Sequence, residues 1–135
     1  MRRGEISFAD FLAARGWFAD AGALVAFSHW ITPHGEPRRY DTHFFFAVAP
    51  AGQAGRADAH ETHDGLWISP GDALARYRAG SFRLVYPTIK HLERLAAFRT
   101  LDDAVEFARH KQIVTILPDH TGETFAIPPE LENAW

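Results

Sequence analysis

The segment that decides the fold is Thr42-His43-Phe44-Phe45-Phe46-Ala47-Val48. Its aromatic and β-branched residues favour a strand, and no residue within it breaks one. Because apolar residues follow one another without alternation, we expect a strand that is buried on both faces. Residues 24–30 and 61–68 have a similar composition and are predicted to form two further strands.

Two shorter strands are predicted towards the end of the chain, at residues 113–117 and 123–127. They flank Pro118-Asp119-His120-Thr121-Gly122, which is rich in turn-forming residues, so we expect a hairpin. The tail from Pro128 onward is expected to be loosely held.

Four helices are predicted, because four start signals precede apolar residues at helical spacing. The signals are Ser7, Ser69-Pro70, Pro87-Thr88 and Thr100. The first two helices should end at Gly16 and Gly80, since glycine adopts the left-handed backbone that often closes a helix. Helices and strands together indicate one α/β (α+β) domain over residues 1–135.

Length and composition are those of one folded domain. The chain has 135 residues, of which 47% are hydrophobic and 23% charged, and its net charge is -3. The absence of a basic excess argues against nucleic acid polymers and anionic membranes as partners. No cysteine is present, which excludes disulfides and thiolate metal sites and fits a reducing compartment, so we expect a cytoplasmic protein. No apolar run approaches the ~18 residues of a membrane span.

Three segments, in this order along the chain, carry a family likeness. They are His29-Trp30-Ile31-Thr32-Pro33, then Pro37-Arg38-Arg39-Tyr40-Asp41-Thr42, then Glu61-Thr62 followed by Trp67-Ile68-Ser69-Pro70-Gly71-Asp72-Ala73-Leu74. Together they resemble the part of a Nudix hydrolase that follows the Nudix box, in the branch that includes the peroxisomal coenzyme A diphosphatases. The resemblance covers residues 5–118. It implies an incomplete Nudix-like α/β/α sandwich with a mixed sheet and a C-terminal helical extension.

The motif that defines the family is missing from this sequence. It reads G-x5-E-x7-R-E-U-x-E-E-x-G-U, where U is aliphatic, yet the chain contains no Arg-Glu and no Glu-Glu dipeptide. We therefore expect the chain to begin inside the insertion that follows the box in this branch.

The resemblance implies a reaction for the complete domain, which is hydrolysis of a nucleoside-diphosphate-linked compound such as coenzyme A or acyl-coenzyme A. Water attacks phosphorus while Mg²⁺ or Mn²⁺, held by glutamates of the box, neutralises the developing charge. Without that carboxylate cluster we expect no firmly bound metal and no catalysis by this chain alone. The alternative is an inactive, truncated protein that binds a ligand or partner.

Glu61 is the catalytic candidate within the chain, because relatives often place a late carboxylate near this position. Asp64 lies close to it in sequence and Asp58 is more remote. The alternative, which a single acid in a loop favours, is that Glu61 is a solvated residue at the start of a strand.

Arg38, Arg39 and Tyr40 are the candidates for substrate binding. Guanidinium groups bind phosphate bidentately, and a tyrosine ring can flank a base or a pantetheine arm. The alternative is that the arginines cap a turn and pair with Asp41 or Glu36, and that Tyr40 belongs to the core. The expected ligand is a phosphate-containing small molecule, and an incompletely covered sheet would favour a homodimer.

Several other patterns are not functional signals. His60 and His63 are three residues apart in a strand-like context, so they should face opposite sides and hold no metal. Residues 52–55 lack the Lys-Ser/Thr ending of a phosphate loop. Trp17, Phe18 and residues 44–46 are predicted to be core rather than a ligand platform.

Overall fold

The structure is a computed structural model that describes residues 6–52, 65–122 and 124–135. Its elements, in chain order, are α1 (Phe8–Ala13), β1 (Val25–Ile31), β2 (Asp41–Phe46), α2 (Pro70–Arg78), α3 (Tyr86–Ala96), α4 (Leu101–His110), β3 (Thr115–Ile116), β4 (Asp119–Thr121) and β5 (Thr124–Ala126). Short 3₁₀ turns occur at Ala21–Ala23 and Pro129–Leu131. The predicted α+β class is confirmed, and no helix in the described ranges is long and apolar enough to cross a membrane.

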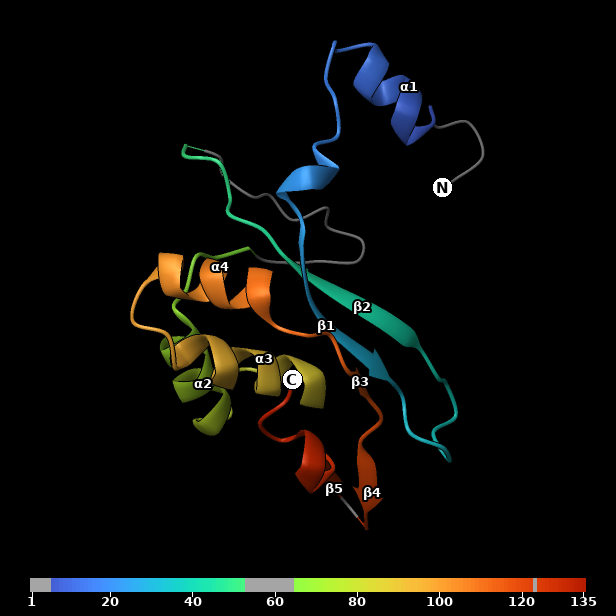
Figure 1. Ribbon diagram of the computed structural model, residues 1–135, viewed down its shortest axis with the longest axis vertical. Coiled ribbons are helices and arrows are strands. Elements are labelled where there is room, and N and C mark those ends of the chain that lie inside the picture. The colour runs from blue at the N-terminus through green and yellow to red at the C-terminus, as the bar shows by residue number, and fades with distance from the viewer. Residues whose placement is uncertain (1–5, 53–64, 123) are drawn as a thin grey trace.

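The larger sheet is mixed, as expected, with the strand order β2-β1-β3 (Figure 1). β1 runs antiparallel to β2 and parallel to β3. The predicted pairing of residues 113–117 with 123–127 is wrong, because β3 joins the main sheet beside Trp30 and the hairpin forms between β4 and β5 instead. Ile116 explains the difference, since its side chain is 0% exposed and the central sheet provides cover that a small hairpin would lack.

In the part of the chain that the structure describes, β2 is covered on one face only, which corrects the expectation of burial on both. Its residues alternate between exposed and half-buried along the strand. Phe44 packs on the core with its ring centroid 4.4 Å from that of His91, whereas Phe45 points away and is 57% exposed. Within the described ranges, α2, α3 and α4 lie together beside the sheet and α1 stands apart from them (Figure 1).

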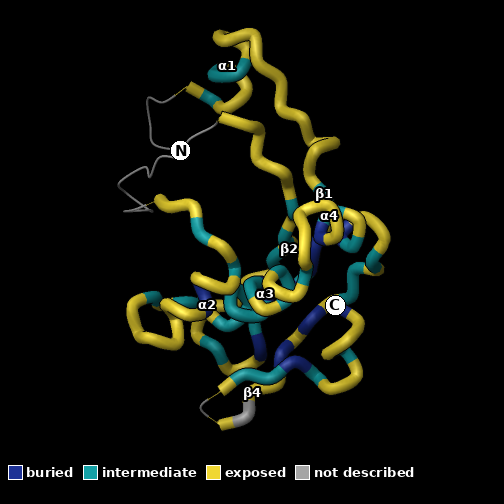
Figure 2. Tube along the Cα trace, turned by 90° about the vertical axis from the view of Figure 1, so that its left-hand side faces the viewer, coloured by how far each residue is buried: buried dark blue, intermediate teal, exposed yellow. Residues whose placement is uncertain are grey.

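Two further sequence predictions were wrong in the described ranges. Trp17 and Phe18 are 58% and 94% exposed, because α1 and the segment after it contribute no buried residue to the core (Figure 2). Residues 65–68 form no strand, so the predicted strand at 61–68 is absent there, and residues 61–64 lie outside the described part.

Three of the four predicted helix starts are capped by the hydroxyl residues that mark them in the sequence, whereas no side chain caps α3. The hydroxyls of Ser7 and Ser69 accept hydrogen bonds from the third residue beyond them, and Thr100 forms a capping box with Asp103. α3 begins at Tyr86, with Pro87 in its first turn. Gly16 and Gly80 adopt positive φ values of 63° and 74° just beyond their helices, as expected for helix-terminating glycines.

The hydrophobic core includes the last residue of the chain, so the prediction of a loose tail was wrong. The core cluster is Trp30, Ile116, Ile127 and Trp135, with Phe44, Tyr86, Val114 and Leu131 packed against it. Trp135 is 3% exposed and meets Trp30 edge-on at a centroid distance of 5.3 Å. Figure 2 shows the buried residues gathered around the middle of the molecule, with the C-terminus among them.

Candidate functional site

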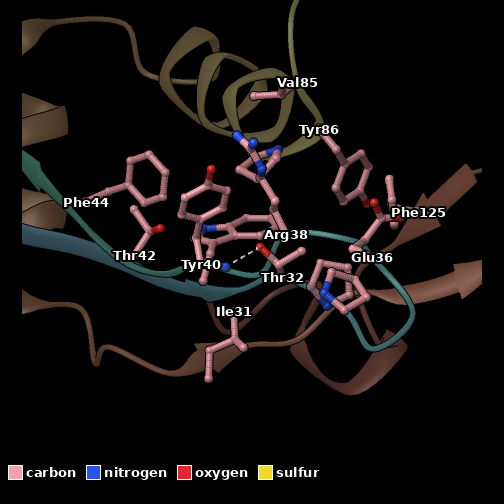
Figure 3. Close-up of a pocket in the computed structure, with 14 residues that line it drawn as sticks. Ile31, Thr32, Glu36, Arg38, Tyr40, Thr42, Phe44, Val85, Tyr86 and Phe125 are labelled. Carbon is pink, nitrogen blue, oxygen red and sulfur yellow. Dashed lines mark hydrogen bonds between the residues drawn. The ribbon is translucent and has the colours of Figure 1, made fainter.

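A pocket of about 400 Å³ opens where β1 ends and β2 begins, between their connecting loop, the start of α3 and the β4–β5 hairpin (Figure 3). Five aromatic side chains line it, namely Trp30, Tyr40, Phe44, Tyr86 and Phe125. Glu36 and Arg38 are the charged residues of the lining. Aromatic walls with a few polar groups are the usual composition of a small-molecule site.

The loop that carries the arginines is held in place by its own hydrogen bonds. Thr32 and Tyr40 exchange two of them, from Thr32 N to Tyr40 O at 2.9 Å and from Tyr40 N to Thr32 Oγ1 at 3.0 Å. Arg39 Nε donates to the Thr32 carbonyl at 2.9 Å and so closes the same loop. The loop therefore continues the β1–β2 ladder beyond the strands and fixes one wall of the pocket.

The two candidate arginines have different positions. The Arg38 side chain extends across the pocket towards the start of α3 (Figure 3), whereas Arg39 is not among the lining residues. Tyr40 lines the pocket and is 61% exposed, so the alternative that it belongs to the core is wrong. Asp41 pairs with His29 rather than with an arginine.

Glu61, the catalytic candidate, lies outside the described residues, as do Asp58, Asp64, His60 and His63. Their roles remain predictions from the sequence.

A second group of polar residues, which the sequence analysis missed, lies on the main sheet. His29 of β1 pairs across the ladder with His43 of β2, and their rings are parallel with centroids 4.1 Å apart. His29 Nε2 is 2.6 Å from Asp41 Oδ1, and His29 Nδ1 is 2.8 Å from Thr115 Oγ1. Asp41 and His43 are two residues apart in β2 and so lie on the same face of the sheet. Only the pairing register shows that His29 of β1 lies beside them.

The described residues do not fit a Mg²⁺ centre. Their one group of at least three potential metal ligands is His29, Asp41 and His43, which supplies two nitrogen donors and one carboxylate. Mg²⁺ prefers an octahedron of oxygen ligands, and water usually completes a set provided by carboxylates.

A buried hydrogen-bonded chain supports the wall of the pocket from behind. The Pro87 carbonyl can only accept, so His91 Nδ1 donates to it at 2.6 Å, and His91 Nε2 then accepts from the Ser28 hydroxyl. Trp30 Nε1 donates to Ser28 Oγ at 3.1 Å. Each buried side-chain nitrogen and oxygen atom of this hydrogen-bonded network has a partner. The network fixes the Trp30 ring between the core and the pocket.

Two basic groups near this network have depressed pKa values. Burial lowers the pKa of His91 to about 4, with a smaller contribution from the charge of Lys111. Burial also lowers the pKa of Lys111 to about 8, and the nearby Arg94 adds to the effect. Lys111 Nζ donates to the Phe27 carbonyl at 2.7 Å and lies over the Phe27 ring. Both groups hold α3 and α4 against β1.

Two curated proteins resemble this chain. Acyl-coenzyme A diphosphatase NUDT19 of Gallus gallus is 31% identical over 103 residues, which is 73% of this chain and 27% of that protein. Its namesake in Homo sapiens is 32% identical over 90 residues, which is 65% of this chain and 24% of that protein. No family model and no solved structure matches.

The chain spans about a quarter of the length of these relatives. The match extends over most of the chain, in agreement with the three Nudix-like segments of the sequence and with the observed α+β fold. The chain therefore belongs to a Nudix-related family.

Proposed function

We propose that this chain forms the substrate-binding part of a Nudix-type hydrolase that acts on a nucleoside-diphosphate-linked compound, with coenzyme A or acyl-coenzyme A as the substrate. The observation that carries the proposal is the position of Arg38, which comes from the most family-like segment and lines an aromatic pocket. The names of the relatives, acyl-coenzyme A diphosphatases, support this choice of substrate.

The pocket has the chemistry that such a ligand requires. Its volume of about 400 Å³ suits a nucleotide base or part of a pantetheine arm, which aromatic rings can flank. Arg38 supplies a planar guanidinium with paired donors that match phosphate oxygens. Glu36 supplies an acceptor at the same pocket, suited to an amino group of the ligand rather than to its phosphates.

Binding and catalysis would then be divided between segments. The phosphate chemistry needs a divalent cation, Mg²⁺ or Mn²⁺, held by a cluster of carboxylates. The sequence contains no Nudix box, so those ligands would come from a segment that this sequence does not contain, and Glu61 would assist them. If no such segment joins this one, the alternative function is a ligand-binding module without activity.

Calorimetric titration with coenzyme A and with ADP tests the proposal. We expect weak binding by the wild type, and at least a tenfold loss in Arg38→Ala, because a charge-assisted hydrogen bond contributes about 1.5–3 kcal/mol. Arg99→Ala is the matched control, since Arg99 is exposed and does not line the pocket. Equal binding by wild type and Arg38→Ala, or no binding by either, would remove the pocket from the proposed function.

A further inference from the structure

We infer that His29, Asp41 and His43 form a binding site for Zn²⁺ on the face of the sheet opposite α3. The inference is independent of the proposed function. Successive residues of a strand point to opposite faces, and Ser28 and Trp30 face α3 through their contacts with His91. His29 therefore points the other way. His43 pairs with it directly, and Asp41 lies two residues earlier on the same face of β2.

The three potential ligand atoms already lie within 4.8 Å of one another. Ligands at about 2.0–2.2 Å around one tetrahedral ion stand roughly 3.3–3.6 Å apart, so the most distant pair of ligand atoms must close by up to about 1.4 Å. The cluster can make this adjustment because the Asp41 side chain is 65% exposed and His43 is exposed as well. His29 supplies the fixed point, since its side chain is only 16% exposed.

A fourth residue, Thr115, holds the far side of the His29 ring. Histidine ligands of metals commonly hydrogen-bond through their second nitrogen, which sets the tautomer and the orientation of the ring. In the described arrangement a proton on His29 Nε2 satisfies Asp41, and the Thr115 hydroxyl donates to Nδ1. With a metal on Nε2 the proton moves to Nδ1, and the hydroxyl accepts instead. Because a hydroxyl serves in both directions, the same framework accommodates the bound state.

The donor set selects the kind of ion. Two imidazoles and one carboxylate suit Zn²⁺ and its borderline neighbours, whereas Mg²⁺ and Ca²⁺ prefer oxygen ligands throughout. Three protein ligands leave at least one coordination position for water. An ion can reach the site because no helix in the described ranges covers this face of β2, where Asp41, His43 and Phe45 are all exposed.

Metal titration of the whole chain tests the site, with Zn²⁺ followed by calorimetry and Co²⁺ by its visible absorption. We expect one ion per chain and, in ¹H–¹⁵N spectra of the imidazoles, shifts confined to His29 and His43. His43→Ala should weaken binding at least tenfold, and Thr115→Val by about tenfold through the outer contact. His110→Ala, at an exposed histidine of α4, should bind as the wild type does.

The result that would overturn the inference is equally specific. His60 and His63 lie outside the described residues and offer a competing pair, so a His60→Ala/His63→Ala variant is included. Retained binding in that variant supports the site on the sheet. Lost binding in it, unchanged binding in His43→Ala, or no saturable binding by the wild type each overturns the proposal.

Discussion

Ser28 on β1 and His91 on α3 share a buried hydrogen bond, with Oγ and Nε2 2.5 Å apart. The bond is the central link of a chain that starts at Trp30 Nε1 and ends at the Pro87 carbonyl. It connects the sheet to the start of α3 through polar atoms that have been removed from water. The network requires the neutral form of His91, because Nε2 must accept the Ser28 hydrogen bond. Protonation of His91 would therefore break the network.

Stability should therefore decrease between neutral and mildly acidic pH. In the folded protein the pKa of His91 is about 4, below the value of 6.5 for an unperturbed imidazole. Between these pH values the unfolded chain binds more protons, so the free energy of unfolding falls as the pH is lowered, by on the order of 3 kcal/mol in total. Above pH 6.5 this contribution is fully present.

Urea denaturation at pH 7 and pH 5 measures the effect. We expect His91→Leu to be less stable at pH 7, because the Ser28 hydroxyl and the Pro87 carbonyl lose their hydrogen-bond partner, but to show a smaller difference between the two pH values. His110→Ala, whose histidine is exposed, should keep the wild-type difference. An equal pH dependence in His91→Leu would show that other groups cause it.

Trp135 should contribute substantially to stability although it is the last residue. Its ring packs edge-on against Trp30 and His91, and Arg94 lies 5.1 Å from the ring centroid. Replacing a buried tryptophan by alanine costs about 3–5 kcal/mol, so we expect Trp135→Ala to lower the denaturation midpoint markedly. Asn133→Ala, at an exposed position of the same segment, is the control and should change stability little. A Trp135→Ala protein as stable as wild type would mean that the tail does not pack on the core in solution.

The isolated chain should not hydrolyse coenzyme A, ADP-ribose or nucleotide sugars in the presence of Mg²⁺ or Mn²⁺. The sequence lacks the carboxylate motif that would hold the divalent cation. Among the described residues, the one group of potential metal ligands is His29, Asp41 and His43, which supplies mostly nitrogen donors. Product release followed by chromatography would measure this directly. Turnover that persists through purification and disappears in Glu61→Gln would contradict the prediction and would assign a catalytic role to Glu61.

The isolated chain should also associate as its concentration rises. Phe45, Phe18 and Trp67 are 57%, 94% and 74% exposed, which leaves apolar surface in contact with water. Among the described strands β2 lies at the edge of its sheet, and an edge strand can pair with a second chain. Light scattering over a concentration series should show an increasing mass, and Phe45→Thr should reduce the increase. A sharp monomer at high concentration with strongly protected amides in residues 44–48 would show that the chain covers its own surface.

The sequence by itself determined the local structure. Ser7, Ser69 and Thr100 mark helix starts because a hydroxyl can bond only to backbone groups a few residues away, so the signal and its effect lie in the same segment. β1 and β2 were predicted for a similar reason, because their composition favours extended backbone. The family-like segments of the sequence also indicated the relationship that the comparisons show.

Tertiary structure alone decided which distant segments meet. Thr115 lies beside His29 rather than in a hairpin, and Trp135 fills the core rather than a loose tail, because each reaches a buried place that only the assembled sheet and helices create. The juxtaposition of His29 with Asp41 and His43 depends on the register between two strands, since a shift of one residue would turn these side chains to the other face. Register follows from packing over the whole sheet, and that is why no local pattern around His29 could reveal its partners.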